Sequence, residues 1–158
     1  MEYNIRTLEK SEYPLLKEFL YEAIFVPEGV EPPPRAILEV PELQVYIAGF
    51  GREEDDRALA VEADGRVVGA VWVRIMDDYG HVDNETPSFA VSLYKKYRGL
   101  GIGTEMMKRM LSILKDCGYR RASLAVQKAN YAVRMYQRIG FDLASETEDE
   151  YIMVNRLQ

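Results

Sequence analysis

The sequence predicts a mixed α/β fold in which helices cover the faces of one sheet, and three observations support this class. Apolar runs with the composition of strands alternate along the chain with segments whose apolar residues recur at helical spacing. The Asp64-Gly65 pair separates two strand-like runs, which is a strong signal for a β-hairpin. A long amphipathic segment then lies between two further apolar runs, an order typical of layered α/β domains.

Strands are expected where a short run is rich in β-branched, aromatic and other apolar residues and is bounded by turn residues. Asp64-Gly65 joins the second and third of these strands, and the final two strands form another hairpin. In chain order, the expected strands are residues 3–8, 57–62, 66–76, 86–93, 121–127, 141–145 and 151–157.

Helices are expected where apolar residues repeat every three or four positions between capping residues. Ser11 is expected to cap the first helix, in whose first turn Pro14 is tolerated, whereas Pro41 lies inside the second. Gly118 is expected to end the third helix in a left-handed conformation, and Asn130 to cap the fourth. In chain order, the expected helices are residues 12–25, 36–47, 102–114 and, with its cap, 130–139.

Length, charge and composition limit the classes of function. A chain of 158 residues fits one domain with one core. Its net charge of −6 argues against general affinity for nucleic acid, and no apolar run has the length of a membrane span. Cys117 is the only cysteine and His81 the only histidine, which argues against a disulfide and a zinc site. We therefore expect a cytoplasmic protein that holds no metal.

A glycine-rich turn at residues 95–104, Lys-Lys-Tyr-Arg-Gly-Leu-Gly-Ile-Gly-Thr, is the most informative segment of the chain. It lies between an expected strand and the long expected helix. Glycines in such a turn leave backbone N–H groups bare, and the helix dipole adds partial positive charge, so the segment suits a pyrophosphate. Two lysines and an arginine gather here although the chain is acidic. The turn therefore predicts a phosphorylated cofactor.

Two common phosphate-binding motifs do not fit this turn. A P-loop ends in Gly-Lys-Ser/Thr, but here Thr104 follows Gly103 directly. A Rossmann fingerprint needs a third glycine where this chain has Thr104 or Met106, depending on the starting glycine. Residues 98–103 instead match the pattern Gln/Arg-x-x-Gly-x-Gly/Ala.

Further motifs follow this hexapeptide at the expected places, namely Asn130 after the next strand and then Tyr136-x-x-x-Gly140-Phe141. Together these motifs resemble the GNAT superfamily of acetyl-CoA-dependent N-acetyltransferases, over about residues 67 to 154. The resemblance implies a central mixed, mostly antiparallel sheet of six to seven strands flanked by about four helices. It implies that residues 1–158 form one domain that moves an acetyl group from acetyl-CoA directly to a primary amine of a small molecule or peptide.

The resemblance also assigns the cofactor-binding main chain. A strand segment would pair with the pantetheine arm, and the glycine turn would wrap the pyrophosphate; the residues concerned are Val91, Ser92, Leu93, Arg98, Gly99, Leu100, Gly101, Ile102, Gly103 and Thr104. The side chain of Arg98 is expected to order the turn as much as to contact phosphate. The strand that contains residues 91–93 and the strand segment 123–127 would splay apart around the thioester. Backbone N–H groups in this gap would polarise the thioester carbonyl.

Two further positions match functional residues of the family and have plain structural alternatives. Asn130 matches a cofactor-contacting position and is equally suited to cap a helix. Tyr136 matches the tyrosine that donates a proton to the CoA thiolate, and it is equally suited to pack beside Phe141.

The general base is the least determined part of the expected site. Relatives such as the ribosomal-protein N-terminal acetyltransferases carry a glutamate on the strand after the long helix, where this chain has Ala125. This departure argues against an N-terminal protein substrate. Glu85, just before the motif strand, is the first candidate for the base, with Asp83 and His81 upstream. The alternative for Glu85 is an ordinary solvated loop acid.

The resemblance places the acceptor site among the N-terminal helices and their loop. That region holds aromatic and acidic side chains suited to a cationic amine, namely Tyr21, Glu22, Phe25, Val26, Glu28, Glu31 and Tyr46. Exposed sheet edges allow a homodimer. Two other hypotheses remain: a non-catalytic acyl-CoA-binding module, suggested by Ala125, and a nucleotide-binding regulator that uses the same glycine turn.

Overall fold

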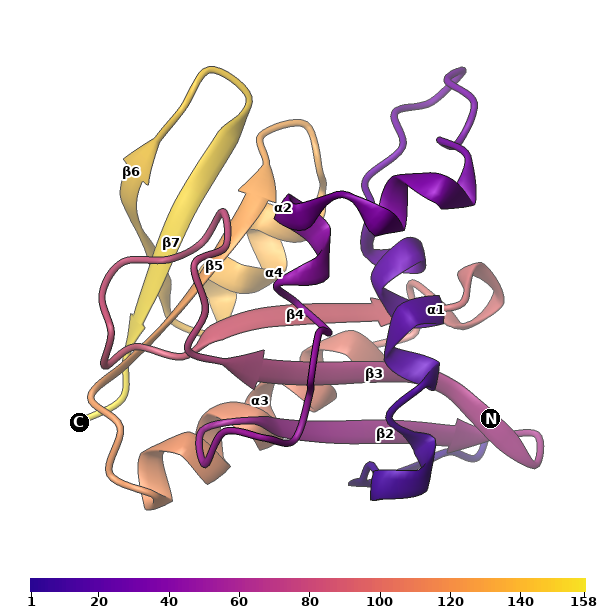
Figure 1. Ribbon diagram of the computed structural model, residues 1–158, viewed down its shortest axis with the longest axis horizontal. Helices are drawn as coiled ribbons and strands as arrows, with labels where there is room; N and C mark the ends of the chain where they lie inside the picture. Colours follow the sequence, from indigo (N-terminus) through magenta and orange to yellow (C-terminus); the bar gives the residue numbers. More distant parts are fainter.

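One sheet of seven strands forms the centre of the computed structural model, which describes residues 1–158 without a gap. Its order is β1-β2-β3-β4-β5-β7-β6, and every neighbouring pair is antiparallel except β4 and β5 (Figure 1). The strands are β1 (Asn4–Thr7), β2 (Arg57–Ala63), β3 (Arg66–Arg74), β4 (Ser88–Leu93), β5 (Arg121–Gln127), β6 (Phe141–Glu146) and β7 (Glu150–Arg156). The predicted mixed, mostly antiparallel sheet is therefore confirmed.

Each strand begins and ends within two residues of its predicted limits. The hairpin between β2 and β3 turns at Asp64 and Gly65, whose φ angles are 52° and 76°. A two-residue type I′ turn needs positive φ at both positions, and Asp-Gly is one of the pairs that adopt it. The composition of this turn therefore accounts for the pairing of its two strands.

The structure has four α-helices, as predicted: α1 (Leu15–Ala23), α2 (Pro41–Gln44), α3 (Ile102–Asp116) and α4 (Ala132–Arg138). The prediction that Ser11 caps a first helix starting at residue 12 is wrong. Ser11 lies inside a short 3-10 turn, Lys10–Glu12, in which the Glu12 carboxylate accepts the Glu9 N–H at 2.9 Å. The α-helix begins only after Pro14.

The prediction of one helix over residues 36–47 is also wrong. A 3-10 helix (Arg35–Glu39) and the short α2 are separated by Val40, which is extended with ψ 144°. The ring of Pro41 excludes the helical conformation for the residue before it, so the helix breaks there and restarts with proline in its first position.

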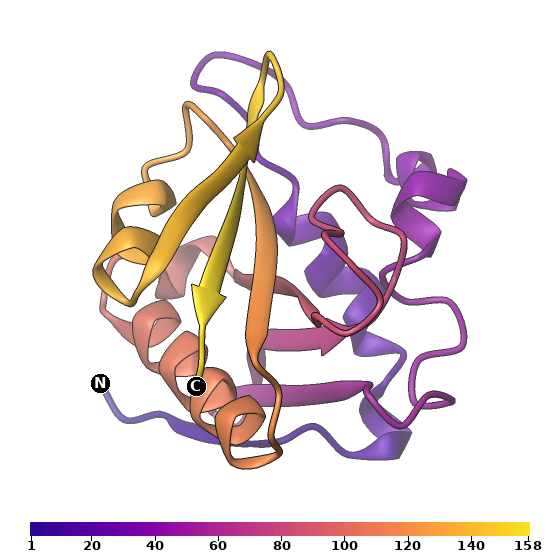
Figure 2. The same ribbon diagram turned by 90° about the vertical axis from the view of Figure 1, so that its left-hand side faces the viewer.

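Helices cover both faces of the sheet. Figure 2 shows α3 and α4 on one side, and α1 and α2 with their connecting segment on the other. A core of 23 buried residues, including the inner face of α3, fills the first side, and a core of 12 residues under α1 fills the second. The third helix ends as predicted, because Gly118 has a φ of 91°.

The parallel pair β4 and β5 creates an opening in the sheet. Only one pair of residues, Ser88 and Ser123, is in register between these strands, and the Ser123 N–H donates to the Pro87 carbonyl at 2.9 Å. Beyond that point the strands diverge (Figure 1). This divergence confirms the expected splaying, and it leaves main-chain groups of both strands without a partner in the sheet.

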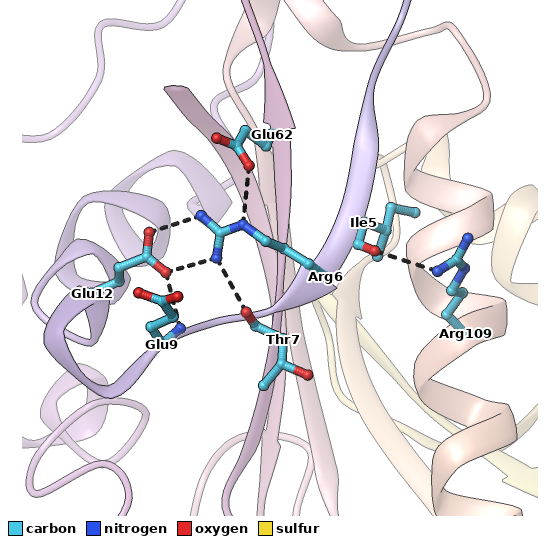
Figure 3. A network of polar contacts seen from close by, with 7 residues as sticks. All are labelled: Ile5, Arg6, Thr7, Glu9, Glu12, Glu62 and Arg109. Atoms are coloured by element: carbon cyan, nitrogen blue, oxygen red, sulfur yellow. Dashed lines mark hydrogen bonds and ion pairs between the residues drawn. The ribbon is translucent and has the colours of Figure 1, made fainter. Parts of the chain in front are cut away.

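A network of ion pairs holds the N-terminal strand in place (Figure 3). The guanidinium of Arg6 donates to both oxygens of Glu12 at 2.8 and 2.9 Å, and its Nε donates to Glu62 on β2 at 3.0 Å. On the other side, Arg109 of α3 donates to the Ile5 carbonyl at 3.3 Å. The bond from Arg6 lowers the pKa of Glu12 to about 2. These contacts join β1 to elements from three parts of the chain.

Candidate functional site

A cavity of about 260 Å³ lies where β4 and β5 diverge. Phe89 to Val91 of β4 and Leu124 to Gln127 of β5 line it. Its walls include Tyr136, which belongs to the core under α3 and α4, and Tyr46, which belongs to the core under α1. The cavity therefore has lining residues from both faces of the sheet.

The glycine turn sits at the start of α3. Gly99 and Gly101 have φ angles of 76° and 86°, a left-handed conformation that other residues adopt at a cost. No side chain caps the helix at Gly101, and the N–H groups of residues 99–104 donate no hydrogen bond within the protein. These six unpaired N–H groups lie at the positive end of a 15-residue helix, a position that favours anions.

The side chain of Arg98 orders this turn. Its Nε donates to the Leu93 carbonyl at the end of β4 at 2.8 Å, and its Nη2 donates to the carbonyl and carboxylate of Glu22 on α1. The guanidinium therefore joins the turn to both β4 and α1. The neighbouring Lys95 and Lys96 are exposed, and Lys96 lies 3.9 Å from an Asp64 oxygen.

Of the three β4 residues expected to face the pantetheine arm, Val91 lines the cavity. Ser92 and Leu93 are buried and lie outside its lining. The Ser92 hydroxyl donates to the Phe19 carbonyl at 2.6 Å, which attaches α1 to the sheet. The side chains of Ser92 and Leu93 are therefore occupied by packing.

Tyr136 reaches the cavity from α4. Only 8% of this residue is exposed, its ring packs against Phe141 at a centroid distance of 6.0 Å, and its hydroxyl has no hydrogen-bond partner in the protein. Burial, with a smaller contribution from Tyr131, raises the pKa of Tyr136 to about 12. The phenol therefore stays protonated at neutral pH and can act as an acid. The side chain of Tyr136 therefore both packs against Phe141 and lines the cavity.

Asn130 also lines the cavity while supporting the start of α4. Its Oδ1 accepts the Ala132 N–H at 2.9 Å, which is an Asx turn. The cap residue of α4 is Tyr131 and not Asn130 as expected. Its amide NH₂ has no acceptor in the protein and can donate to a ligand.

The structure does not bring the three candidates for the base to the cavity. Glu85 is exposed, and its main-chain N–H donates to Asp83 at 2.8 Å. Asp83 forms an ion pair with Arg121, and the His81 Nδ1 contacts the Met76 carbonyl at 2.8 Å. None of the three lines the cavity.

The expected acceptor residues divide into two groups. Phe25 and Tyr46 line the cavity, whereas Val26, Glu28 and Glu31 do not. The Tyr21 hydroxyl donates to the Pro33 carbonyl, and Glu22 is paired with Arg98. This region therefore contributes aromatic rings to the cavity lining and none of the acids expected from it.

Two residues that the sequence did not suggest also line the cavity, Tyr79 and Glu150. Glu150 is the first residue of β7 and lies opposite Gln127 of β5. Burial, Asp149 and Asp78 raise the pKa of Glu150. The pairing of β5 with β7 is the signal that identifies Glu150, and this long-range pairing cannot be read from local sequence.

The segment between β3 and β4 packs tightly beside the opening. A Cβ added to Gly80 would stand 2.9 Å from main-chain atoms of Leu124 and Ala125, so only glycine fits there without a shift. Next to it, the Ser88 hydroxyl donates to Asp78 at 2.5 Å. Burial raises the pKa of Asp78. This segment therefore fixes the end of the opening where β4 and β5 meet.

No cluster of three or more His, Cys, Asp or Glu side chains is arranged to hold a metal ion. None of the helices combines the length and the apolar character needed to cross a membrane.

Comparisons with known proteins agree with this geometry. The model of the acetyltransferase (GNAT) family matches residues 15–141. An uncharacterized N-acetyltransferase of Methanocaldococcus jannaschii is 30% identical over 118 residues, which cover 72% of this chain and 70% of that protein. A mycothiol acetyltransferase of Pseudarthrobacter chlorophenolicus is 30% identical over 84 residues, which cover 52% of this chain and only 26% of that protein.

Among solved structures, the PaiA N-acetyltransferase of Thermoplasma acidophilum in complex with coenzyme A has a similar fold. The TM-score is 0.72 at 19% sequence identity, and the match covers 99% of each chain.

Proposed function

Because the chain belongs to the GNAT acetyltransferase family, we propose that it transfers the acetyl group of acetyl-CoA directly to a primary amine of a small molecule or peptide, with residues 1–158 acting as one domain. One observation carries this proposal. Unpaired N–H groups at residues 99–104 occur together with a cavity at the opening of the sheet that a buried tyrosine lines. The similar fold of PaiA, solved with coenzyme A, supports it.

The residues present fit acetyl-CoA as a substrate. The N–H groups at the start of α3 would bind the pyrophosphate, and Val91 and Asn130 would contact the arm that leads into the cavity. Acetyl-CoA supplies a thioester carbonyl that an amine can attack. Main-chain N–H groups of the diverging strands would stabilise the oxyanion that develops on this carbonyl, an effect typically worth about 3 kcal/mol for each donor.

Tyr136 would protonate the leaving sulfur. The tyrosine keeps its hydroxyl proton at neutral pH, because its ordinary pKa is about 10 and burial raises it to about 12. A free thiol has a pKa of about 8.5, so this proton transfer is uphill by itself; it is completed when the acylated nitrogen gives a proton back to the tyrosinate.

The acceptor end of the cavity favours an amine carried on an apolar body. Phe25, Tyr46, Tyr79 and Leu43 form its walls, together with aliphatic residues of α1. Aromatic faces attract a cationic amine, and the apolar surface excludes strongly hydrated groups.

A non-catalytic acyl-CoA-binding module is the second candidate function. The presence of Ala125 where some relatives carry a glutamate favours it, since the simplest base is missing from β5.

Two assays separate these functions. Calorimetry with acetyl-CoA, CoA, ATP and NAD should show binding of the first two only; binding of only ATP or NAD would make the turn a nucleotide site. Release of free thiol should then be measured with acetyl-CoA and an amine panel, for example 2-phenylethylamine, tyramine, ethanolamine and spermidine. Turnover supports the enzyme, with the apolar amines expected to react fastest. Binding of acetyl-CoA with no turnover on any amine supports the module.

A further inference from the structure

Glu150 is the only charged residue that lines the cavity. Fourteen of the 17 lining residues are hydrophobic, and the two other polar ones, Gln127 and Asn130, are neutral. Glu150 is partly buried, so its carboxylate loses part of its hydration there, which costs free energy unless a ligand or a partner compensates.

The Glu150 carboxylate has no partner within the protein. Its main-chain N–H donates to the Thr147 hydroxyl at 3.1 Å, but its side chain makes no hydrogen bond and no ion pair. The nearby cation Lys128 is paired with Glu146 at 3.5 Å. The carboxylate is therefore available to a cation that enters the cavity.

The groups around Glu150 increase its affinity for a cation and for a proton. The acids Asp149 and Asp78 raise its pKa, and its charge acts in turn on the hydroxyls of Tyr46 and Tyr79. These groups come from the turn before β7, from the segment after β3 and from the segment after α2. A carboxylate whose pKa is raised by burial and by like charge is a stronger base than an exposed one.

The sheet register places Glu150 close to the position of the absent β5 glutamate. Gln127 pairs with Glu150 and Ala125 pairs with Ile152 in the antiparallel ladder. Since side chains alternate along a strand, these four residues share one face of the sheet, on the acceptor side of the opening. A carboxylate on β7 therefore stands beside the place where relatives carry one on β5.

We propose that Glu150 is the residue that binds the ammonium group of the acceptor and takes its proton, an inference that rests on the proposed function. The ammonium gives one proton to the Glu150 carboxylate, and the neutral nitrogen attacks the thioester carbon. The new N–C bond forms as the C–S bond breaks, and Tyr136 protonates the sulfur. The nitrogen then gives its second proton to the Tyr136 phenolate, which becomes neutral again. Glu150 releases the proton that it took to solvent. One proton is therefore released in each turnover.

The test compares Glu150→Gln with Glu148→Gln, which removes one exposed acid from the same turn without touching the cavity. At pH 7 only about 0.1% of an alkylamine with a pKa near 10 is neutral, and a positioned base typically contributes about 10² or more to the rate. E150Q should therefore have a kcat at pH 7 about 100-fold below wild type. Between pH 7 and 9 its kcat should rise about tenfold per pH unit, because the amine loses its proton to solvent. The kcat of wild type and of E148Q should change much less over this pH range.

A second measurement is independent of turnover. Acetyl-CoA should bind wild type, E150Q and E148Q with equal affinity in calorimetry. NMR titration of the carboxyl carbons should show that adding the amine lowers the pKa of Glu150, because an ammonium group stabilises the carboxylate.

The inference is overturned if E150Q has the same kcat as E148Q at every pH, if the loss of kcat in E150Q does not change with pH, or if E150Q differs only by a higher KM. A wild-type protein that binds acetyl-CoA and acetylates no amine overturns the proposed function together with this inference. An active wild type with any of the first three results overturns this inference alone.

Discussion

Replacement of Gly101 by aspartate, compared with replacement by asparagine, tests the pyrophosphate site with a single change of charge. The two side chains have nearly the same shape, and both suit the N-terminal cap of a helix. No atom lies within 4 Å of a Cβ built at this position, whose φ is 86°. Both variants therefore carry the same backbone cost, about 1 kcal/mol, which is smallest for Asn and Asp among non-glycine residues.

The difference between the variants comes from repulsion between the aspartate and bound phosphate. Two unit charges about 6 Å apart repel by about 1.4 kcal/mol at an effective dielectric constant of about 40. Two pyrophosphate charges double this, and salt reduces the sum to about 2 kcal/mol. Gly101→Asp should therefore bind CoA about 30-fold more weakly than Gly101→Asn.

The assay is calorimetric titration of both variants with CoA, with thermal unfolding recorded in parallel. The aspartate variant should unfold at the same or a slightly higher temperature, because its charge is favourable at the positive end of α3. A loss of affinity therefore cannot come from unfolding. Equal dissociation constants for the two folded variants would refute the assignment of phosphate to this turn.

Three further predictions address the acid, the opening and the N-terminal strand. Tyr136→Phe should lower kcat about 10- to 100-fold in the thiol assay while thermal stability and CoA affinity stay unchanged, because the hydroxyl makes no bond in the protein; an unchanged kcat would remove its role as the acid. Gly80→Ala should lower the free energy of unfolding in urea by about 1–3 kcal/mol, since its Cβ would stand 2.9 Å from the Ala125 nitrogen; a neutral result would show that the segment moves freely. Arg6 lowers the pKa of Glu12 from 4.5 to about 2. The ionised Glu12 therefore adds to the free energy of unfolding above pH 4.5, and this contribution is lost as the pH falls towards 2. Glu12→Gln should therefore be less stable than wild type at pH 6, with the difference disappearing near pH 2; a constant difference would contradict this.

Local patterns predicted much of the fold correctly. The Asp64-Gly65 hairpin, the long helix and the left-handed end at Gly118 each depend on a few adjacent residues, and all three form as expected. The second helix was predicted wrongly because apolar spacing was given more weight than Pro41, whose ring controls the backbone of the residue before it. The predicted cap at Ser11 does not form because Glu9 and Glu12 make the capping box of the 3-10 turn that precedes α1.

The site was predictable to the extent that it depends on one segment. The glycine turn and Tyr136 lie in local motifs; the turn is found at the start of α3, and Tyr136 lines the cavity. Glu85 is close in sequence to the motif strand, but in the structure it is exposed and lies outside the cavity. Glu150 enters the cavity only through the register between β5 and β7, which pairs residues more than 20 positions apart. Such pairing is determined by the whole sheet, so the local sequence around residue 150 gives no sign of it.

A crystal structure of the protein with acetyl-CoA tests the central claim most directly. The expected result has pyrophosphate oxygens about 2.7–3.2 Å from main-chain nitrogens between residues 99 and 104. The thioester should then lie between β4 and β5, with its sulfur beside the Tyr136 hydroxyl. Acetyl-CoA bound in another cleft, with the glycine turn empty, would contradict the account.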